Sequence, residues 1–292
     1  MQVSANGIAI EVDDQGPANG QPLLLIMGLG MQLTAWPDEL VQLLVTRGFR
    51  VIRMDNRDAG LSQGLDQLGV PNIAWQALRH SLHLGARSAY SLSDMAADSC
   101  GVLDALGLAD AHVCGASMGG MIAQRLALCW PRRVRSLSLM MTSSGSRRLP
   151  QPGWTVRQVL LSRPAGAGAD AVVTHLEKLM RVIGSPAFPP DPQRQRERLL
   201  AFARRAWRPQ GTARQLVAVV ADGDRSALLG QIVAPTAIIH GQADPLMPVA
   251  AAHDLAALMR SASVDIVPGM GHDLPLQLLP RFADAIAANA RR

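Results

Sequence analysis

The sequence is poor in cysteine, with three in 292 residues. Cys100, Cys114 and Cys129 form no CxxC pair and are odd in number, which argues against a disulfide framework and against a zinc site. Each lies in a strand-like or helix-like segment, so we expect buried free thiols.

Long apolar runs are also missing. No segment approaches the ~20 residues that a membrane span requires, so we expect no membrane partner. The first residues, MQVSANGIAIEVDD, lack the basic start and the apolar core of a secretory signal. Together with the expected free thiols, this predicts a cytoplasmic protein. The sequence gives no information about the oligomeric state.

Nucleic-acid-binding motifs are absent as well, although the formal net charge is +5. The excess is mostly arginine, and part of it is clustered between Arg194 and Arg214. We interpret this cluster as a solvated, arginine-rich surface and expect no nucleic-acid partner. Recognition of a carboxylate-bearing substrate is the alternative.

The features that are present indicate a globular α/β protein. Hydrophobic residues make up 48% of the chain, enough for a large core. Apolar runs that read as strands are Leu23–Met27, Arg50–Met54, Ala111–Cys114, Val134–Met141, Thr236–His240 and Val264–Val267. Helical patterns alternate with them at Trp36–Arg47, Ser91–Leu106, Met118–Cys129, Val249–Met259 and Leu274–Ala290. Such alternation predicts a mostly parallel, twisted sheet flanked by helices on both faces.

The alternation is interrupted from about Ser143. Residues 143–230 show helical patterns, many arginines and a proline cluster, with no convincing strand. We therefore predict a core formed by residues 1–142 and 231–292, and a helical cap inserted at 143–230.

A possible nucleophile stands between the strand Ala111–Cys114 and the following helix, in the pentapeptide Gly115-Ala-Ser-Met-Gly119. This fits G-x-S-x-G, in which the serine occupies a strained turn and glycines remove side chains that would clash. The N-terminus of the helix then directs its N–H groups at the place where negative charge develops during acyl transfer. Ser117 is the candidate.

A serine hydroxyl is a poor nucleophile unless a base takes its proton. His272, in PGMGHDLP, follows the last predicted strand, and the preceding glycines allow a loop to bring its ring close. Asp244, in HGQADPLMP, lies just past the strand Thr236–His240, where its carboxylate can orient the imidazole. The three side chains predict a catalytic triad.

An oxyanion hole needs one backbone N–H after the nucleophile and another from the loop after an early strand. Met118 supplies the first, and Leu29, in Met27-Gly-Leu-Gly30, is the candidate for the second. The loop lacks the third glycine of a dinucleotide fingerprint, and no P-loop lysine follows. We therefore expect no nucleotide cofactor.

With these pieces in the order serine, acid, histidine, the chain resembles the α/β-hydrolase superfamily along almost its whole length. The segments GASMGG, GQADPLMP and GMGHDLP match its nucleophile, acid and base segments. MDNRDAGLS resembles the D-x-R-G-x-G-x-S loop of the family, with Asp58 in place of the usual glycine. In the family this loop braces the site.

Within the superfamily, IMGLGMQLTAWPDEL and VIRMDNRDAGLS are most similar to cap-bearing esterases related to aclacinomycin methylesterase. Many members have His-Gly where this chain has Met27-Gly28, a change the esterases tolerate because the backbone supplies the hydrogen bond. The resemblance implies a carboxylesterase that acts on a small-molecule ester and needs no metal or organic cofactor.

Several other activities stay open. Lactonases, thioesterases, C–C bond hydrolases and cofactor-free perhydrolases of this fold use the same triad. Epoxide hydrolases and haloalkane dehalogenases use an aspartate nucleophile, and Ser117 argues against both. A hydrolase-fold binding protein without turnover is the alternative of a different class, but such proteins often lack a triad member, and all three candidates are present here.

Overall fold

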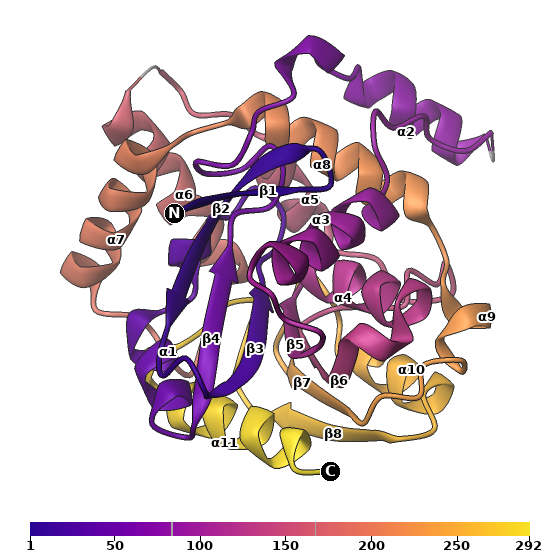
Figure 1. Ribbon diagram of the computed structural model, residues 1–292. Helices are drawn as coiled ribbons and strands as arrows, with labels where there is room; N and C mark the ends of the chain where they lie inside the picture. The colour runs from indigo at the N-terminus through magenta and orange to yellow at the C-terminus, as the bar shows by residue number, and fades with distance from the viewer. Residues whose placement is uncertain (83, 167) are drawn as a thin grey trace.

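The computed structural model describes residues 1–82, 84–166 and 168–292, and is built around one sheet of eight strands (Figure 1). The strand order across the sheet is β1-β2-β4-β3-β5-β6-β7-β8. The strands are β1 (Gln2–Ala5), β2 (Ile8–Gln15), β3 (Gln21–Ile26), β4 (Phe49–Met54), β5 (Ala111–Ala116), β6 (Val134–Met140), β7 (Thr236–Gly241) and β8 (Ala262–Val267).

The six strands β4, β3, β5, β6, β7 and β8 pair with their neighbours in parallel. At one edge of the sheet, β2 pairs antiparallel with both β1 and β4. The central strand β3 lies between β4 and β5, with Leu24 opposite both Ile52 and Val113. Its apolar run is buried because helices cover both faces of the sheet. The predicted fold class is confirmed.

Each face of the sheet buries its own apolar cluster. Helices α1 (Asp38–Val45) and α11 (Leu279–Ala290) pack on one face and contribute Leu40 and Phe282 to its cluster. Helices α3 (Leu92–Ala105), α4 (Met118–Cys129) and α10 (Ala250–Leu258) pack on the other. Between β4 and α3, the chain forms a 3-10 turn (Asp66–Leu68) and helix α2 (Ile73–Ser81), which projects from the body (Figure 1).

A helical insertion separates β6 from β7. It contains α5 (Trp154–Leu161), α6 (Ala169–Ile183), α7 (Pro192–Arg205), α8 (Pro209–Asp222) and α9 (Ser226–Leu229). None of its described residues belongs to a strand, as the sequence pattern predicted.

Local signals in the sequence set several element ends. Asn6 and Gly7 have φ of 50° and 78°, the geometry of a tight hairpin turn between β1 and β2. Ser91 accepts a hydrogen bond from the N–H of Asp94, whose carboxylate accepts one from the N–H of Ser91, and this capping box begins α3.

Three expectations need correction. Helix α1 begins at Asp38 rather than Trp36, because Pro37 has an extended ψ of 137°. Helix α11 begins at Leu279, after Pro275 and the 3-10 turn Leu276–Leu278. The free thiols of Cys100 and Cys114 are buried, but Cys129 is exposed because it ends α4 on the solvent side.

Among the described helices, none has the length and hydrophobicity needed to span a bilayer.

Candidate active site

Ser117 occupies a strained turn between the parallel strand β5 and helix α4. Its φ of 55° and ψ of −120° lie outside the regions that non-glycine residues normally adopt. The turn is fixed from both sides: the N–H of Ser117 donates to the carbonyl of Met140 in β6 at 2.9 Å, and its carbonyl accepts from the hydroxyl of Thr142 at 2.7 Å. The hydroxyl is therefore presented at the carboxyl edge of the sheet.

The glycines on either side of Ser117 leave no room for side chains. A Cβ on Gly115 would lie 2.3 Å from the carbonyl oxygen of Gly119, and a Cβ on Gly119 would lie 2.0 Å from the carbonyl oxygen of Ile26. Both distances are far below van der Waals contact. The G-x-S-x-G spacing is thus required by the close packing of β5, α4 and the end of β3.

The structure brings the three predicted triad residues together from three separate loops. The Nε2 atom of His272 lies 3.0 Å from the Oγ of Ser117, and its Nδ1 lies 2.7 Å from the Oδ2 of Asp244. Asp244 follows β7, and His272 follows β8. His272 and Asp244 are 9% and 5% exposed, so these hydrogen bonds are largely shielded from water.

The carboxylate of Asp244 is oriented by its own loop. Its Oδ1 accepts hydrogen bonds from the N–H groups of Leu246 and Met247 at 2.9 and 2.8 Å, which leaves Oδ2 for the imidazole. A second histidine, His240, lies 3.7 Å from Oδ2, with its Nε2 at 2.6 Å from the carbonyl oxygen of Met247. Burial lowers the pKa of His240, which favours a neutral ring beside the carboxylate.

The two predicted oxyanion donors belong to segments that adjoin the serine. Met118 begins α4, whose N-terminal N–H groups face the Ser117 turn. Gly28 packs against the serine, since a Cβ there would lie 3.1 Å from the Cβ of Ser117. Within the described residues, neither Leu29 nor Met118 donates its N–H to another group of the chain. Both N–H groups thus remain available to a ligand.

The insertion holds the histidine loop directly. The N–H of His272 donates to the carbonyl of Ile183 at 2.7 Å, and the N–H of Gly271 donates to the hydroxyl of Ser185 at 2.8 Å. Ser185 also hydrogen-bonds Asp273, the residue after His272. Burial raises the pKa of Asp273, although the Ser185 contact opposes this shift. The sequence analysis did not identify Ser185 or Asp273.

The segment Met54–Ser62 links the sheet to the insertion. Asp55 is fully buried and accepts hydrogen bonds from the N–H of Leu33 at 2.6 Å and from Arg205 at 2.7 Å. Asp58, which replaces the usual glycine of the family at a φ of 67°, forms a bidentate ion pair with Arg214 at 2.7 and 2.8 Å. Burial pushes the pKa of Asp58 upward, but the hydrogen bonds from Arg214 and its neighbours outweigh it, so the pKa lies below its ordinary value.

The arginine cluster is therefore only partly a solvated surface. Arg194 and Arg196 are exposed, as predicted, but Arg205 and Arg214 are paired with carboxylates of the core. Arg214 is 1% exposed, and its guanidinium is fully engaged by Asp58, Asp66 and the carbonyl of Gly69. In the sequence, Asp58 was the signal that one arginine of the cluster is buried, because a buried carboxylate requires a cation beside it.

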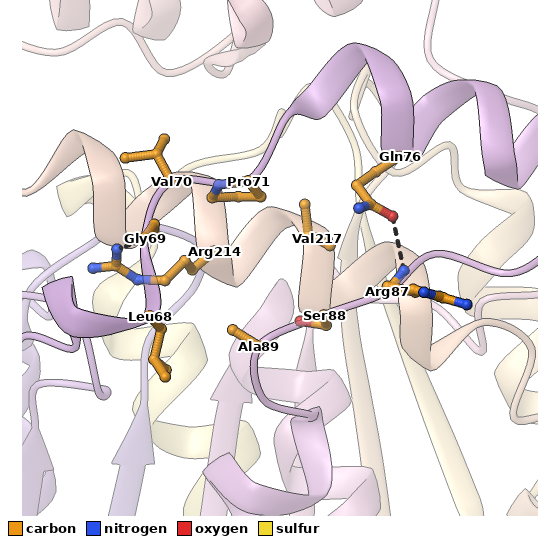
Figure 2. A pocket seen from close by; sticks show the side chains of 10 residues that line it. All are labelled: Leu68, Gly69, Val70, Pro71, Gln76, Arg87, Ser88, Ala89, Arg214 and Val217. Atoms are coloured by element: carbon orange, nitrogen blue, oxygen red, sulfur yellow. Dashed lines mark hydrogen bonds between the residues drawn. The ribbon is translucent and has the colours of Figure 1, made fainter.

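A cavity of about 260 Å³ lies between α8 and the segment that includes α2 (Figure 2). Arg214 and Val217 line it from α8, and Gln76 lines it from α2. No predicted catalytic residue lines this cavity. In the part of the chain that the structure describes, no group of three His, Cys, Asp or Glu residues is placed to hold a metal ion.

Comparisons with known proteins show the fold family. Residues 21–277 match the family model of the alpha/beta hydrolase fold. The chain is 30% identical over 289 residues to rhodomycin D methylesterases of Streptomyces sp. (strain C5) and Streptomyces peucetius, covering 92% of this chain and 91% of each relative. A meta-cleavage product hydrolase from Pseudomonas fluorescens IP01 superposes with a TM-score of 0.78 at 20% identity, covering 100% of this chain and 97% of that one. The chain belongs to the α/β-hydrolase fold family.

Proposed function

We propose that this protein is a serine carboxylesterase that cleaves esters through an acyl-enzyme intermediate. The observation that carries the proposal is the hydrogen-bonded series from Ser117 Oγ to His272 Nε2 and from His272 Nδ1 to Asp244 Oδ2. A nucleophile, a base and an acid that orients the base form the minimum set for acyl transfer through serine.

In the first half of the reaction, Ser117 Oγ attacks the ester carbonyl carbon while His272 Nε2 takes its proton. The imidazolium that forms carries its second proton on Nδ1, where the carboxylate of Asp244 stabilises it. His272 then gives the Nε2 proton to the leaving alcohol, so that the C–O bond of the ester breaks and an acyl-serine remains.

The tetrahedral intermediate carries a negative charge on the former carbonyl oxygen. We assign its stabilisation to the N–H groups of Leu29 and Met118, which have no acceptor among the described residues. The N-terminus of α4 adds its positive end of the helix dipole at the same place. Such preorganised donors cost no rearrangement when the charge develops.

In the second half, water takes the place of the alcohol. His272 removes a proton from this water, which attacks the acyl-serine, and then returns the proton to Ser117 Oγ as the acid product leaves. All proton transfers use one imidazole, and no step requires a metal or an organic cofactor.

We further propose that residues 143–230 act as a cap that roofs this site and restricts the substrate. Its contacts with both catalytic loops, through Ile183 and Ser185 to the His272 loop and through α8 to the loop after β3, support that role. The Streptomyces relatives are named as methylesterases of rhodomycin D, so methyl esters are the substrate class we propose first.

The test is ester hydrolysis by wild-type protein and by Ser117→Ala, measured on p-nitrophenyl esters from acetate to palmitate and on methyl esters of small and bulky acids. Loss of the nucleophile should reduce kcat by about 10³- to 10⁶-fold. Ser138→Ala is the matched control, because Ser138 is a buried serine of β6 whose hydroxyl, among the described residues, accepts one long hydrogen bond from the amide of Asn289 at 3.5 Å.

Equal hydrolysis by wild type and Ser117→Ala would contradict the assignment of the nucleophile. If wild type labels with a fluorophosphonate but hydrolyses none of these esters, the serine is activated and the substrate class is wrong. Lactones, thioesters, C–C cleavage substrates and perhydrolysis of acids then become the panel, because they use the same three residues.

A further inference from the structure

Gln215 of α8 bridges two loops of the core at the proposed site. Its side chain is fully buried. The Oε1 atom accepts a hydrogen bond from the N–H of Gly30 at 2.8 Å, and Nε2 donates to the carbonyl of Arg57 at 2.7 Å. One amide therefore ties the loop after β3 to the loop after β4, and it does so from the insertion.

The bond to Gly30 acts on the turn that contains the proposed oxyanion donor. The N–H of Met31 donates to the carbonyl of Gly28 at 3.2 Å, and Gly30 has a φ of +66°. A positive φ at the third position of such a turn is the signature of type II. The central peptide of this turn joins Leu29 to Gly30, so Gln215 holds the peptide plane next to the Leu29 N–H.

Helix α8 is itself placed tightly against the core. A Cβ on Gly211 would lie 2.1 Å from the carbonyl oxygen of Asp58, and a Cβ on Gly30 would lie 2.7 Å from the hydroxyl of Thr212. The residue before Gln215 is Arg214, whose buried ion pair with Asp58 fixes the same turn of the helix. Gln215 therefore has little freedom to follow the loop if the loop moves.

We infer that Gln215 is a positioning residue for the oxyanion hole, through which the insertion sets the orientation of the Leu29 N–H. This inference rests on the proposed function. Without Gln215, the partly buried N–H of Gly30 loses its acceptor, and the Leu29–Gly30 peptide reorients to find another. The neighbouring Leu29 N–H then no longer points at the developing oxyanion, so transition-state stabilisation falls while substrate binding is retained.

The test compares Gln215→Met with Gln32→Met. Gln32 is a matched control: it is also a buried glutamine joining the loop after β3 to the insertion, but its amide bonds the carbonyls of Phe202 and Ala206 at 2.9 and 2.5 Å. Active-site titration with a fluorophosphonate gives the concentration of competent enzyme, so partial misfolding does not affect kcat.

Outright loss of an oxyanion donor costs about 10²- to 10³-fold in kcat, and because Leu29 N–H is displaced rather than removed, we expect about 10- to 100-fold for Gln215→Met. KM should stay within about threefold, since the interaction strengthens only in the transition state. The affinity of a boronic acid that forms a tetrahedral adduct with Ser117 should fall by the same factor as kcat/KM, whereas Gln32→Met should change none of these values.

A second variant, Gln215→Glu, covers the case in which Gln215→Met does not fold. Burial raises the pKa of a carboxyl group, so at neutral pH Gln215→Glu supplies a neutral acid with the same acceptor and donor. The neighbouring charges are already paired, Arg57 with Asp98 and Arg214 with Asp58. Either protonation state keeps an oxygen that accepts from the N–H of Gly30, so kcat of Gln215→Glu should stay within about threefold of wild type.

The possible results distinguish failure of the inference from failure of the proposed function. If wild type hydrolyses esters and Gln215→Met keeps the kcat of Gln32→Met, the inference is wrong and the proposed function stands. A Gln215→Glu kcat that falls by about the 10- to 100-fold expected for Gln215→Met also overturns the inference alone, because this variant keeps the acceptor for Gly30. If wild type hydrolyses no ester and does not react with the fluorophosphonate, both fall together.

Discussion

The sheet core and the helical insertion hold themselves together in different ways. Both faces of the sheet bury large apolar clusters, whereas the insertion has one small cluster of its own, formed by Val172, Val173, Leu176, Leu199 and Phe202. The insertion joins the core through polar contacts, of which Arg214 with Asp58 and Arg225 with Gln124 are buried, and Arg205 with Asp55 and Arg125 with Asp222 are partly buried. The insertion adds few apolar side chains to the sheet clusters: Ala218 and the half-buried Val219 from α8, Leu229 from α9, and the half-buried Phe188.

This difference has a consequence for the site. Apolar burial is non-directional and tolerates small shifts of the packed surfaces, whereas a bidentate ion pair fixes both distance and orientation. The three proposed triad residues stand on the core, where strand ends already set their positions. The loop around Leu29 and the loop around His272 also donate hydrogen bonds to the insertion, from Gly30 N–H and His272 N–H. These bonds fix the orientation of two loops whose groups must point at the substrate.

The largest effect should come from the core side of the comparison. Asp244→Asn keeps the shape of the side chain but presents an amide to His272 Nδ1, which favours the wrong tautomer. We expect kcat to fall by about 10³- to 10⁴-fold while the unfolding midpoint changes little. Steady-state kinetics and a urea titration measure both, and near wild-type kcat would show that the Asp244 contact is not catalytic.

The next effect tests the docking of the insertion. Arg214→Met leaves Asp58 buried without its cation, which should lower the free energy of unfolding by about 3–5 kcal/mol. The double variant Asp58→Gly with Arg214→Met removes both charges, and glycine suits the φ of 67° at position 58. Chemical denaturation should show that the double variant recovers much of the loss; no recovery would mean that the pair is not the source of the cost.

A smaller effect concerns a polar residue inside the core. His112 lies at the start of β5, within 2.8 Å of the Ser136 hydroxyl, and burial lowers its pKa from 6.5 to about 4. The unfolded chain therefore binds this proton at a higher pH than the folded chain. Stability should be full above about pH 6.5 and decrease by up to about 3 kcal/mol as pH falls to about 4.

Urea midpoints of wild type and His112→Gln across this range give the measurement. Glutamine keeps polar atoms for Ser136 and Gln21 but has no proton to gain, so the difference in stability between the two proteins should change with pH as stated. Parallel curves would show that His112 titrates normally in the folded protein.

The smallest effect is expected on the exposed surface of the insertion. Arg196 pairs with Asp170 and Glu177, but its side chain is 44% exposed. Arg196→Ala should change the free energy of unfolding by about 0.5 kcal/mol or less and leave kcat unchanged. A loss of unfolding free energy as large as that of Arg214→Met would mean that exposure does not distinguish arginines that stabilise the insertion from those that do not.

Much of the fold and the candidate site could be predicted from local signals. The apolar runs around Leu24 and Ile238 have the length of buried strands, and Ser91 with Asp94 marks a helix start in four letters. Ser117 could be singled out because a G-x-S-x-G turn needs its glycines for local steric reasons. Asp244 and His272 could be placed because residues after parallel strands meet at one edge of the sheet.

Gln215, Ser185 and Asp273 could not be found in this way. A glutamine within a helix has no local signature, and its partner Gly30 is 185 residues away in the chain. The same holds for Arg214, which reads as a surface residue until Asp58 is seen beside it. Buried polar pairs depend on which segments meet, and sequence patterns of a few residues carry no information about that.

The sequence by itself determined the alternation of strands and helices, the strained turn at Ser117 and the order of the three candidate catalytic residues. These follow from interactions over a few residues: apolar periodicity, capping and steric limits on φ. Only the tertiary structure decided how the insertion attaches to the core and which arginines are buried. Those outcomes depend on desolvating charges in a particular arrangement, and that cost is offset only when the partner is already in place.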